Sequence, residues 1–328
     1  MDARVMSKAL ELVPSPAPLA QLEHLVERAR SYAGEARAKN THRAYAADFE
    51  AFEAWCQANG LVAMPSPPAA VAAYAAALAD LGRRPSTITR ALTGIAYAHR
   101  SQGHEWVRAH PAITMVMAGI RRRLGVAQKK KAPIMVDREL EALVAILGDD
   151  PRGRRDRALL LVGFFGAFRR SELVAVTVED VERQREGLII RVRRSKSDQE
   201  GRGRDKGIPY ASRSSVCPVR ALDAWLEASG IKAGPIFRAI DRHGHMKDRA
   251  LSDQTVADVV QRVALAAGLD PENLAAHSLR SGFVTSAARR GKSLDAIMRQ
   301  TFHATERVAR GYIQHATVFD DNAATGIA

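Results

Sequence analysis

The chain has 328 residues, 46% of them hydrophobic, which is enough for two domains with separate cores. Its 49 lysines and arginines exceed its 36 aspartates and glutamates, and the net charge of +13 favours a polyanionic partner such as DNA or RNA. The cysteine spacing, with only Cys56 and Cys217, excludes a disulfide framework or a cysteine zinc site, and the apolar runs fall below the ~20 residues of a membrane span.

The start of the chain contains three prolines within residues 1–19, which we expect to form a flexible lead-in. It lacks the sustained apolar core of a signal peptide. Together with the two separate cysteines, this predicts a cytoplasmic protein that does not contact a membrane.

Residues 20–125 predict an all-α domain, because apolar residues recur at helical spacing and no strand alternation interrupts them. Prolines near the starts and glycines near the ends fit helix boundaries. The four helices that we expect run from about Thr41 to Gly60, from Pro67 or Pro68 to Gly82, from Pro85 to Gly103, and from Pro111 to Leu124.

Residues 126–135 have no apolar periodicity and end near a proline, so they predict a basic interdomain linker. Six cations lie within the eleven residues from Arg121 to Lys131. An ordinary solvated connector and a segment that passes close to phosphates explain this run equally well.

Residues 136–328 predict a second domain that is mainly α-helical with a small antiparallel β-sheet. Helices are expected over 137–147, over 154–176, and again over 217–230 and 251–268. Between them, apolar and polar residues alternate from Gly187 to Tyr210 with a break at two glycines, a pattern typical of a β-hairpin with a polar tip.

Four stretches of the second domain contain side chains capable of phosphate chemistry. The segment GAFRRSEL supplies Arg169, and the hairpin offers Lys196 near its turn. His277 and Arg280 stand three positions apart, on one face if that segment is helical. Near the end of the chain, His303 precedes Tyr312 by nine residues.

These six residues, in this order and at these spacings, resemble the signature of the tyrosine recombinase (lambda-type phage integrase) family: G-x-x-R-x-S-E-L, a hairpin lysine, H-x-x-R, and a histidine nine residues before a tyrosine. The resemblance implies an N-terminal all-α core-binding (SAM-like) domain and a C-terminal α+β catalytic domain. It also implies a site-specific DNA recombinase that forms a 3′-phosphotyrosyl intermediate, works as a homotetramer on double-stranded DNA, and needs no metal, ATP or other cofactor.

The chemistry of the residue types agrees with these roles. The guanidinium forks of Arg169 and Arg280 suit the non-bridging oxygens of a phosphate in its transition state. Tyr312 is the expected nucleophile, and because about one phenol in a thousand is ionised at neutral pH it needs a proton acceptor, for which His277 is the candidate. We expect His303 to donate to a phosphate oxygen and Lys196 to protonate the departing 5′ oxygen.

Further polar residues are candidates for contact with DNA outside the reaction centre, through the backbone phosphates. They lie at the start of the first expected long helix, in the basic run before and within the linker, and beside Arg169. They are Thr41, Arg43, Arg121, Arg122, Arg123, Lys129, Lys130, Lys131 and Arg170.

Several assignments have rivals in the sequence. Lys206, or Arg194 nearby, competes with Lys196 for the hairpin cation, and Tyr210 competes with Tyr312. Glu172 is expected to be structural, bonded to backbone or to an arginine near the site. The pair His243 and His245 reads as a solvated loop rather than a metal site, since no carboxylate or cysteine set completes it.

Two positions depart from the family pattern, Phe302 where glycine is usual and Arg170 where an apolar residue is frequent. We expect the first to tilt the turn that carries His303, and the second adds a cation beside Arg169. Three alternative functions are a type IB topoisomerase, a DNA-binding regulator with a decayed active site, and a basic RNA-binding scaffold. The last leaves the six-residue pattern unexplained.

Overall fold

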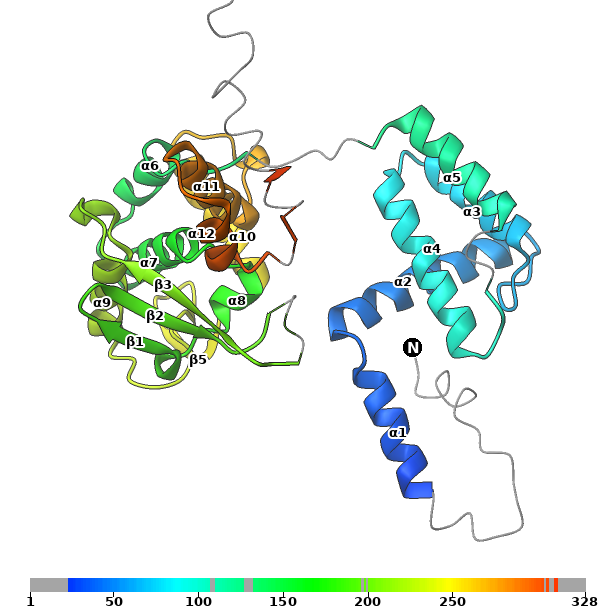
Figure 1. The fold of residues 1–328 in the computed structure, drawn as a ribbon, viewed down its shortest axis with the longest axis horizontal. Helices are drawn as coiled ribbons and strands as arrows, with labels where there is room; N and C mark the ends of the chain where they lie inside the picture. The colour runs from blue at the N-terminus through cyan, green and yellow to red at the C-terminus, as the bar shows by residue number, and fades with distance from the viewer. Residues whose placement is uncertain are drawn as a thin grey trace, which may run out of the picture. The chain divides into compact units, whose positions relative to one another are not determined.

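The computed structural model describes residues 23–106, 110–126, 132–195, 198, 200–303, 305–306 and 310–311 (Figure 1). The chain divides into two compact units, Met1–Lys129 and Lys130–Ala328. The division falls inside the segment 126–135 that the sequence suggests as a linker. Among the described helices, none has the length and apolar content needed to cross a bilayer.

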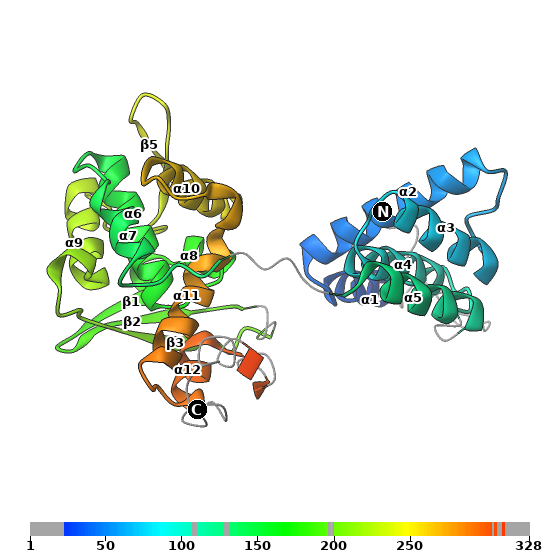
Figure 2. The same cartoon turned by 90° about the horizontal axis from the view of Figure 1, so that it is seen from above.

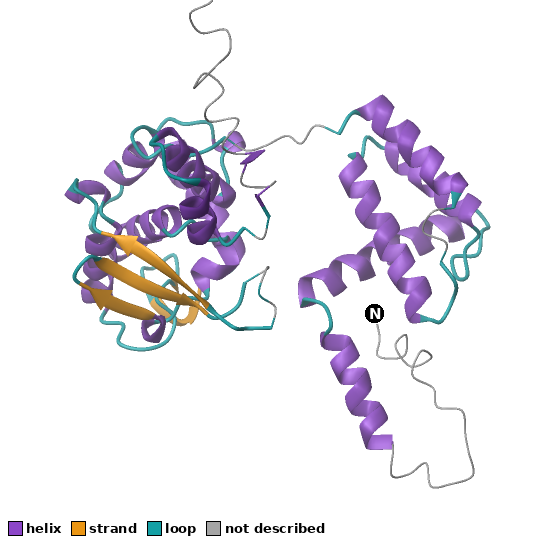
Figure 3. Ribbon diagram, viewed as in Figure 1, coloured by secondary structure: helices purple, strands orange, loops and turns teal. Residues whose placement is uncertain are grey.

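The first unit consists, over its described residues, of helices that pack around a small aromatic and aliphatic core (Figure 3). Phe52, Tyr74 and Ile95 are among its buried residues. Gly94 allows α2 and α4 to cross closely, because a Cβ there would lie 2.9 Å from the Cβ of Asp48. The helices are α1 (Glu23–Glu35), α2 (Lys39–Ala58), α3 (Pro68–Asp80), α4 (Pro85–Ser101) and α5 (Pro111–Leu124).

The four helices expected over this unit are present with boundaries within a few residues, and prolines open α3, α4 and α5. The fixed φ of proline and its missing N–H suit the first helical turn. Helix α1 was not singled out from the sequence. Its mostly exposed residues explain this, since a helix without a buried face has no strong apolar period.

The second unit places a three-stranded antiparallel sheet against a layer of helices, and α12 lies beside β3 in both views (Figures 1 and 2). The sheet order is β1-β2-β3, and Ile190 pairs with Lys206 across β2 and β3. The helices are α6 (Glu139–Ala145), α7 (Pro151–Phe165), α8 (Arg170–Val174), α9 (Pro218–Ser229), α10 (Asp253–Ala266), α11 (Ala276–Arg289) and α12 (Leu294–Thr301). The strands are β1 (Val181–Gln184), β2 (Gly187–Val192), β3 (Arg204–Pro209), β4 (Arg238–Ile240) and β5 (Met246–Ala250).

The predicted fold class, mainly α with a small antiparallel sheet, is confirmed, and so is the hairpin formed by β2 and β3. Strand β1 and the β4–β5 ladder were not predicted. Their residues are mostly exposed or half-buried, so no apolar alternation marks them in the sequence.

Helix α7 forms the centre of the second core, with Leu159, Leu160 and Leu161 fully buried. The continuous apolar run of this segment therefore reflects a helix surrounded by protein. The helix does not continue to residue 176 as the sequence suggested. It ends at Phe165, Ala167 takes a left-handed conformation with φ of 46°, and α8 begins at Arg170. The break places Arg169 at the N-terminus of α8.

Residues 132–136, most of which the sequence analysis counted in the linker, pack into the second unit against α11. Ile134 is fully buried, and its N–H donates to the carbonyl of Ser278 at 3.0 Å. Gly282 makes this approach possible, because a Cβ there would lie 1.8 Å from the carbonyl oxygen of Ile134. The position of α11 thus depends on glycine at residue 282, which has no side chain to collide with Ile134.

We predict that Gly282→Ala lowers the free energy of unfolding by about 3 kcal/mol, because the methyl group must displace a backbone carbonyl. Calorimetry of the full chain measures this loss. Gly119→Ala in α5 is the matched control: nothing lies within 4 Å of its Cβ position, so better helix propensity should stabilise that unit by about 0.5 to 1 kcal/mol. Equal stability of Gly282→Ala and the wild type would contradict the close contact.

Candidate active site

Arg169 is held at the start of α8 by Glu172, one turn later. The backbone N–H of Arg169 donates to Glu172 Oε2 at 3.0 Å, and Arg169 Nη1 lies 2.5 Å from Oε1. The carboxylate is buried with 1% of its side chain exposed, whereas the Arg169 side chain is 23% exposed. Glu172 therefore has the structural role expected from the sequence, and the guanidinium keeps access to solvent.

Arg280 lies on α11, which confirms that the His277–Arg280 segment is helical. It is 2% exposed, and its guanidinium donates to the carbonyl oxygens of Ala167, at 2.6 Å, and of Thr301. Both carbonyls belong to turns next to other site residues. His277 lies in the first turn of the same helix, and its side chain keeps contact with solvent although surrounding protein removes part of its hydration.

His303 follows directly after the C-terminus of α12. The helix ends with Phe302 in a left-handed conformation, with φ of 56° and ψ of 37°, and this reverses the chain toward the site. The Thr301 hydroxyl lies 2.9 Å from His303 Nδ1 and 2.8 Å from the carbonyl of Ile297. The carbonyl can only accept, so both contacts are satisfied when the hydroxyl donates to Ile297 and accepts from Nδ1–H of His303. If the hydroxyl donates to Nδ1 instead, the ring proton lies on Nε2.

The four residues Arg169, His277, Arg280 and His303 share one electrostatic environment. Burial, followed by the charges of Arg280 and Arg169, lowers the pKa of His303 to about 4. The pKa of His277 is also lowered, first by lost hydration and then by Arg280 and Arg169. Both imidazoles are therefore neutral at pH 7 in the DNA-free chain. A concentration of positive charge beside neutral imidazoles is suited to binding an anion.

Lys206 belongs to the same neighbourhood and is fully buried. Its side chain points from β3 toward α12 and donates to the carbonyl of Gln300. Lys196 and Tyr312, the expected general acid and nucleophile, lie outside the described residues. Tyr210, the rival tyrosine, is 47% exposed just after β3.

The candidate DNA contacts of the first unit are solvent-accessible where the structure describes them. Thr41 is half-buried and Arg43 exposed in α2, and Arg121, Arg122 and Arg123 are exposed in the last turn of α5. Arg170 of the second unit pairs with Asp253 at 3.0 Å. The remaining three, Lys129, Lys130 and Lys131, lie outside the described residues.

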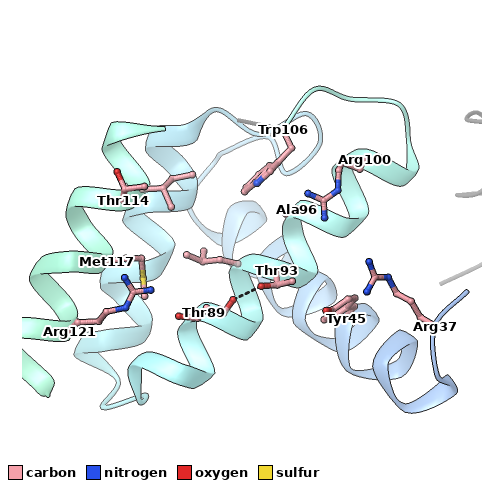
Figure 4. A pocket seen from close by; sticks show the side chains of 12 residues that line it. Arg37, Tyr45, Thr89, Thr93, Ala96, Arg100, Trp106, Thr114, Met117 and Arg121 are labelled. Carbon is pink, nitrogen blue, oxygen red and sulfur yellow. Dashed lines mark hydrogen bonds between the residues drawn. The ribbon is translucent and has the colours of Figure 1, made fainter. Parts of the chain in front are cut away.

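A basic depression that the sequence analysis did not identify lies between α2, α4 and α5 (Figure 4). Its volume is about 380 Å³, and the guanidiniums of Arg37, Arg100 and Arg121 surround it together with Thr89 and Thr93. The sequence signal that could have indicated this depression is the helical spacing of Thr89, Thr93 and Arg100, which places them on one face of α4. The depression was not predicted because single arginines in separate segments do not form a sequence motif.

His243 and His245 lie on the exposed β4–β5 loop, where Asp241 Oδ2 contacts Lys247 Nζ at 2.8 Å. Their ring centroids are 6.3 Å apart. Within the part of the chain that the structure describes, no three histidine, cysteine or acidic residues form a group that could hold a metal ion.

Comparisons with known proteins show the family of the chain and its fold. The model of the phage integrase family matches residues 134–318. An integrase/recombinase XerD homologue of Selenomonas ruminantium is 40% identical over 307 residues, which span 92% of this chain and 89% of the relative.

Two solved structures share the fold at low identity. A dimer of lambda integrase residues 75–356 bound to a COC′ core site has a TM-score of 0.59 and 18% identity, over 88% of this chain and 93% of that one. A XerH site-specific recombinase in a post-cleavage complex with its difH substrate has a TM-score of 0.58 and 19% identity, over 76% and 68% of the two chains. The family match and the long alignment to the XerD homologue identify this chain as a member of the phage integrase family, a site-specific tyrosine recombinase.

Proposed function

We propose that the chain cleaves and rejoins double-stranded DNA through a covalent 3′-phosphotyrosyl intermediate on Tyr312, without metal or ATP. The observation that supports this proposal most directly is the shared environment of Arg169, His277, Arg280 and His303. These residues come from separate parts of the chain, and a scissile phosphate is the ligand that paired guanidiniums and neutral imidazoles suit.

In the proposed reaction the phenol of Tyr312 attacks phosphorus and the 5′ oxygen leaves, so a phosphotyrosine bond forms as a phosphodiester bond breaks. His277, neutral at pH 7, accepts the phenolic proton. Arg169 and Arg280 stabilise the extra negative charge on the non-bridging oxygens. To donate to a phosphate oxygen, His303 needs its ring proton on Nε2, which requires the Thr301 hydroxyl to turn from the Ile297 carbonyl and donate to Nδ1.

Lys196 is the proposed general acid that protonates the departing 5′ oxygen. The environment of its rival Lys206 supports this choice, because a fully buried ammonium bonded to the Gln300 carbonyl cannot reach a substrate without leaving its position.

Double-stranded DNA as the substrate is supported by the net charge of +13 and by the DNA complexes of lambda integrase and XerH, which share the fold. We propose a homotetramer as the active assembly, a cytoplasmic location, and a DNA-binding role for the first unit, whose basic depression would hold backbone phosphates. A type IB topoisomerase would instead relax supercoiled DNA without a defined sequence, and a decayed regulator would form no adduct.

Tyr312→Phe should abolish the covalent adduct while DNA affinity stays within about threefold, because only one oxygen is removed. The recombination site is first found by incubating the protein with sheared DNA of its source organism, trapping adducts with detergent and sequencing them. Nicked half-sites built from that sequence then test the variant. An adduct that persists in Tyr312→Phe would assign the nucleophile to another residue, and a wild-type protein that forms none would refute the proposed reaction.

Arg169→Lys should slow single-turnover cleavage by about 100-fold or more, because an ammonium cannot reproduce the paired hydrogen bonds of a guanidinium. The retained charge still pairs with buried Glu172, so the variant should remain folded by circular dichroism. Arg183→Lys, whose exposed side chain pairs with Asp223, is the control and should cleave at the wild-type rate. Equal cleavage by both variants would exclude Arg169 from phosphate binding.

Arg100→Ala should weaken DNA binding and reduce the slope of log affinity against log salt concentration by about 1, the value for one lost phosphate contact. Fluorescence anisotropy with duplex DNA measures both quantities. The control is Arg220→Ala, which removes an exposed arginine from α9 in the other unit. If the two variants have the same slope, the depression does not contact DNA.

A further inference from the structure

The turn that carries His303 contains an unusual residue for its backbone conformation. Phe302 has φ of 56°, a region that side-chain-bearing residues rarely adopt and that glycine adopts without strain. Glycine is the usual residue here in the family that the sequence resembles. Something in this chain must therefore offset the cost and fix the turn.

The Phe302 side chain lies close to two cations of β3 and is only 4% exposed. The Lys206 ammonium lies 4.1 Å from the centroid of its ring, and the Arg204 guanidinium lies 5.1 Å from it. A cation over an aromatic face is favourable, and more so where water is excluded. The ring therefore gives the turn an attachment to β3 that glycine would not provide.

Lys206 also connects the two turns next to the site residues. Its ammonium donates to the Gln300 carbonyl at the end of α12, where a positive charge complements the helix dipole. The same ammonium lies 5.1 Å from the ring of Phe168, the residue before Arg169. One buried side chain therefore contacts the neighbours of both Arg169 and His303.

We propose that Lys206 and Phe302 form a clamp that positions the His303 imidazole for the recombination reaction, with Lys206 as a positioning residue and not a catalytic one. The inference rests on the proposed role of His303. Nearby bonds from Gln300 Nε2 to the carbonyls of Phe165, at 2.8 Å, and of Gly207, at 2.9 Å, support the same turn.

The charge of the clamp responds to its surroundings. Burial lowers the pKa of Lys206 to about 7, with further lowering by Arg280, Arg169 and Arg204, while the Glu172 carboxylate opposes the shift. The ammonium is thus partly deprotonated at neutral pH in the DNA-free chain. A phosphate bound between the guanidiniums would add negative charge and favour the protonated form. Substrate binding therefore strengthens the clamp.

The first test measures the tautomer of His303 in the DNA-free full chain by long-range ¹H–¹⁵N correlation of the histidine rings, with His303→Gln for assignment. The wild type should show a single tautomer, because the turn holds the ring in one position. Lys206→Met and Phe302→Leu should each show a mixture, because the turn loses its attachment. Phe302→Leu retains the lysine charge and so separates positioning from electrostatics. An unchanged tautomer in both variants would overturn the proposal.

The second test compares single-turnover cleavage of the nicked half-site by Lys206→Met, Phe302→Leu and the double variant. Each should be slower by about 10- to 100-fold with DNA affinity little changed, and the double variant should be no slower than the single ones, because all three lose one clamp. The clamp would be contradicted if the rate loss of the double variant equalled the product of the two single losses, or if the variants cleaved at the wild-type rate. Lys232→Met, an exposed lysine in the same unit, is the control.

The two tests separate the clamp from the proposed reaction. Wild-type protein that forms an adduct, with variants that cleave normally, would refute the clamp and leave the reaction intact. Wild-type protein that forms no adduct would refute the reaction, while the tautomer measurement would still decide whether Lys206 and Phe302 position His303.

Discussion

A buried guanidinium holds the two halves of the candidate active site together. Arg280 donates to the carbonyls of Ala167 and Thr301, which belong to turns that precede Arg169 and His303. Charge-assisted bonds from a rigid fork fix both turns at once, and a flexible ammonium could not span them in the same way. Arg280, which is proposed to bind phosphate, therefore also sets the geometry of the site. Replacing Arg280 by alanine would remove both roles at once.

Much of this organisation could be predicted from the sequence. Apolar periodicity with prolines at helix starts gave four helices of the first unit, and alternation around two glycines gave the β2–β3 hairpin. The resemblance of Arg169, His277, Arg280 and His303 to the tyrosine recombinase signature indicated a shared site that no single segment shows by itself. Local sequence signals were sufficient to predict the helices and the hairpin whose structure is determined by their own residues.

The remainder depended on contacts between distant segments. Gly166 is a local signal for the end of α7, but the left-handed turn falls on Ala167, a residue that favours helix. The sequence predicted that Lys206 was one of the cations of the polar hairpin. In the structure it is buried on β3, and its ammonium donates to the Gln300 carbonyl. The depression bounded by Arg37, Arg100 and Arg121 forms only when three helices pack. Tertiary packing overrides the propensity of single residues in each case.

The aromatic residue at the end of α12 has a consequence for how related chains diverge. A glycine at that position adopts the turn without a steric penalty and offers no ring for a cation to contact, so a buried lysine opposite it on the strand would only be costly. The proposed clamp therefore couples the two positions. Across the family, an aromatic side chain before the histidine should be accompanied by a basic residue at the strand position facing it, and glycine by other residues there.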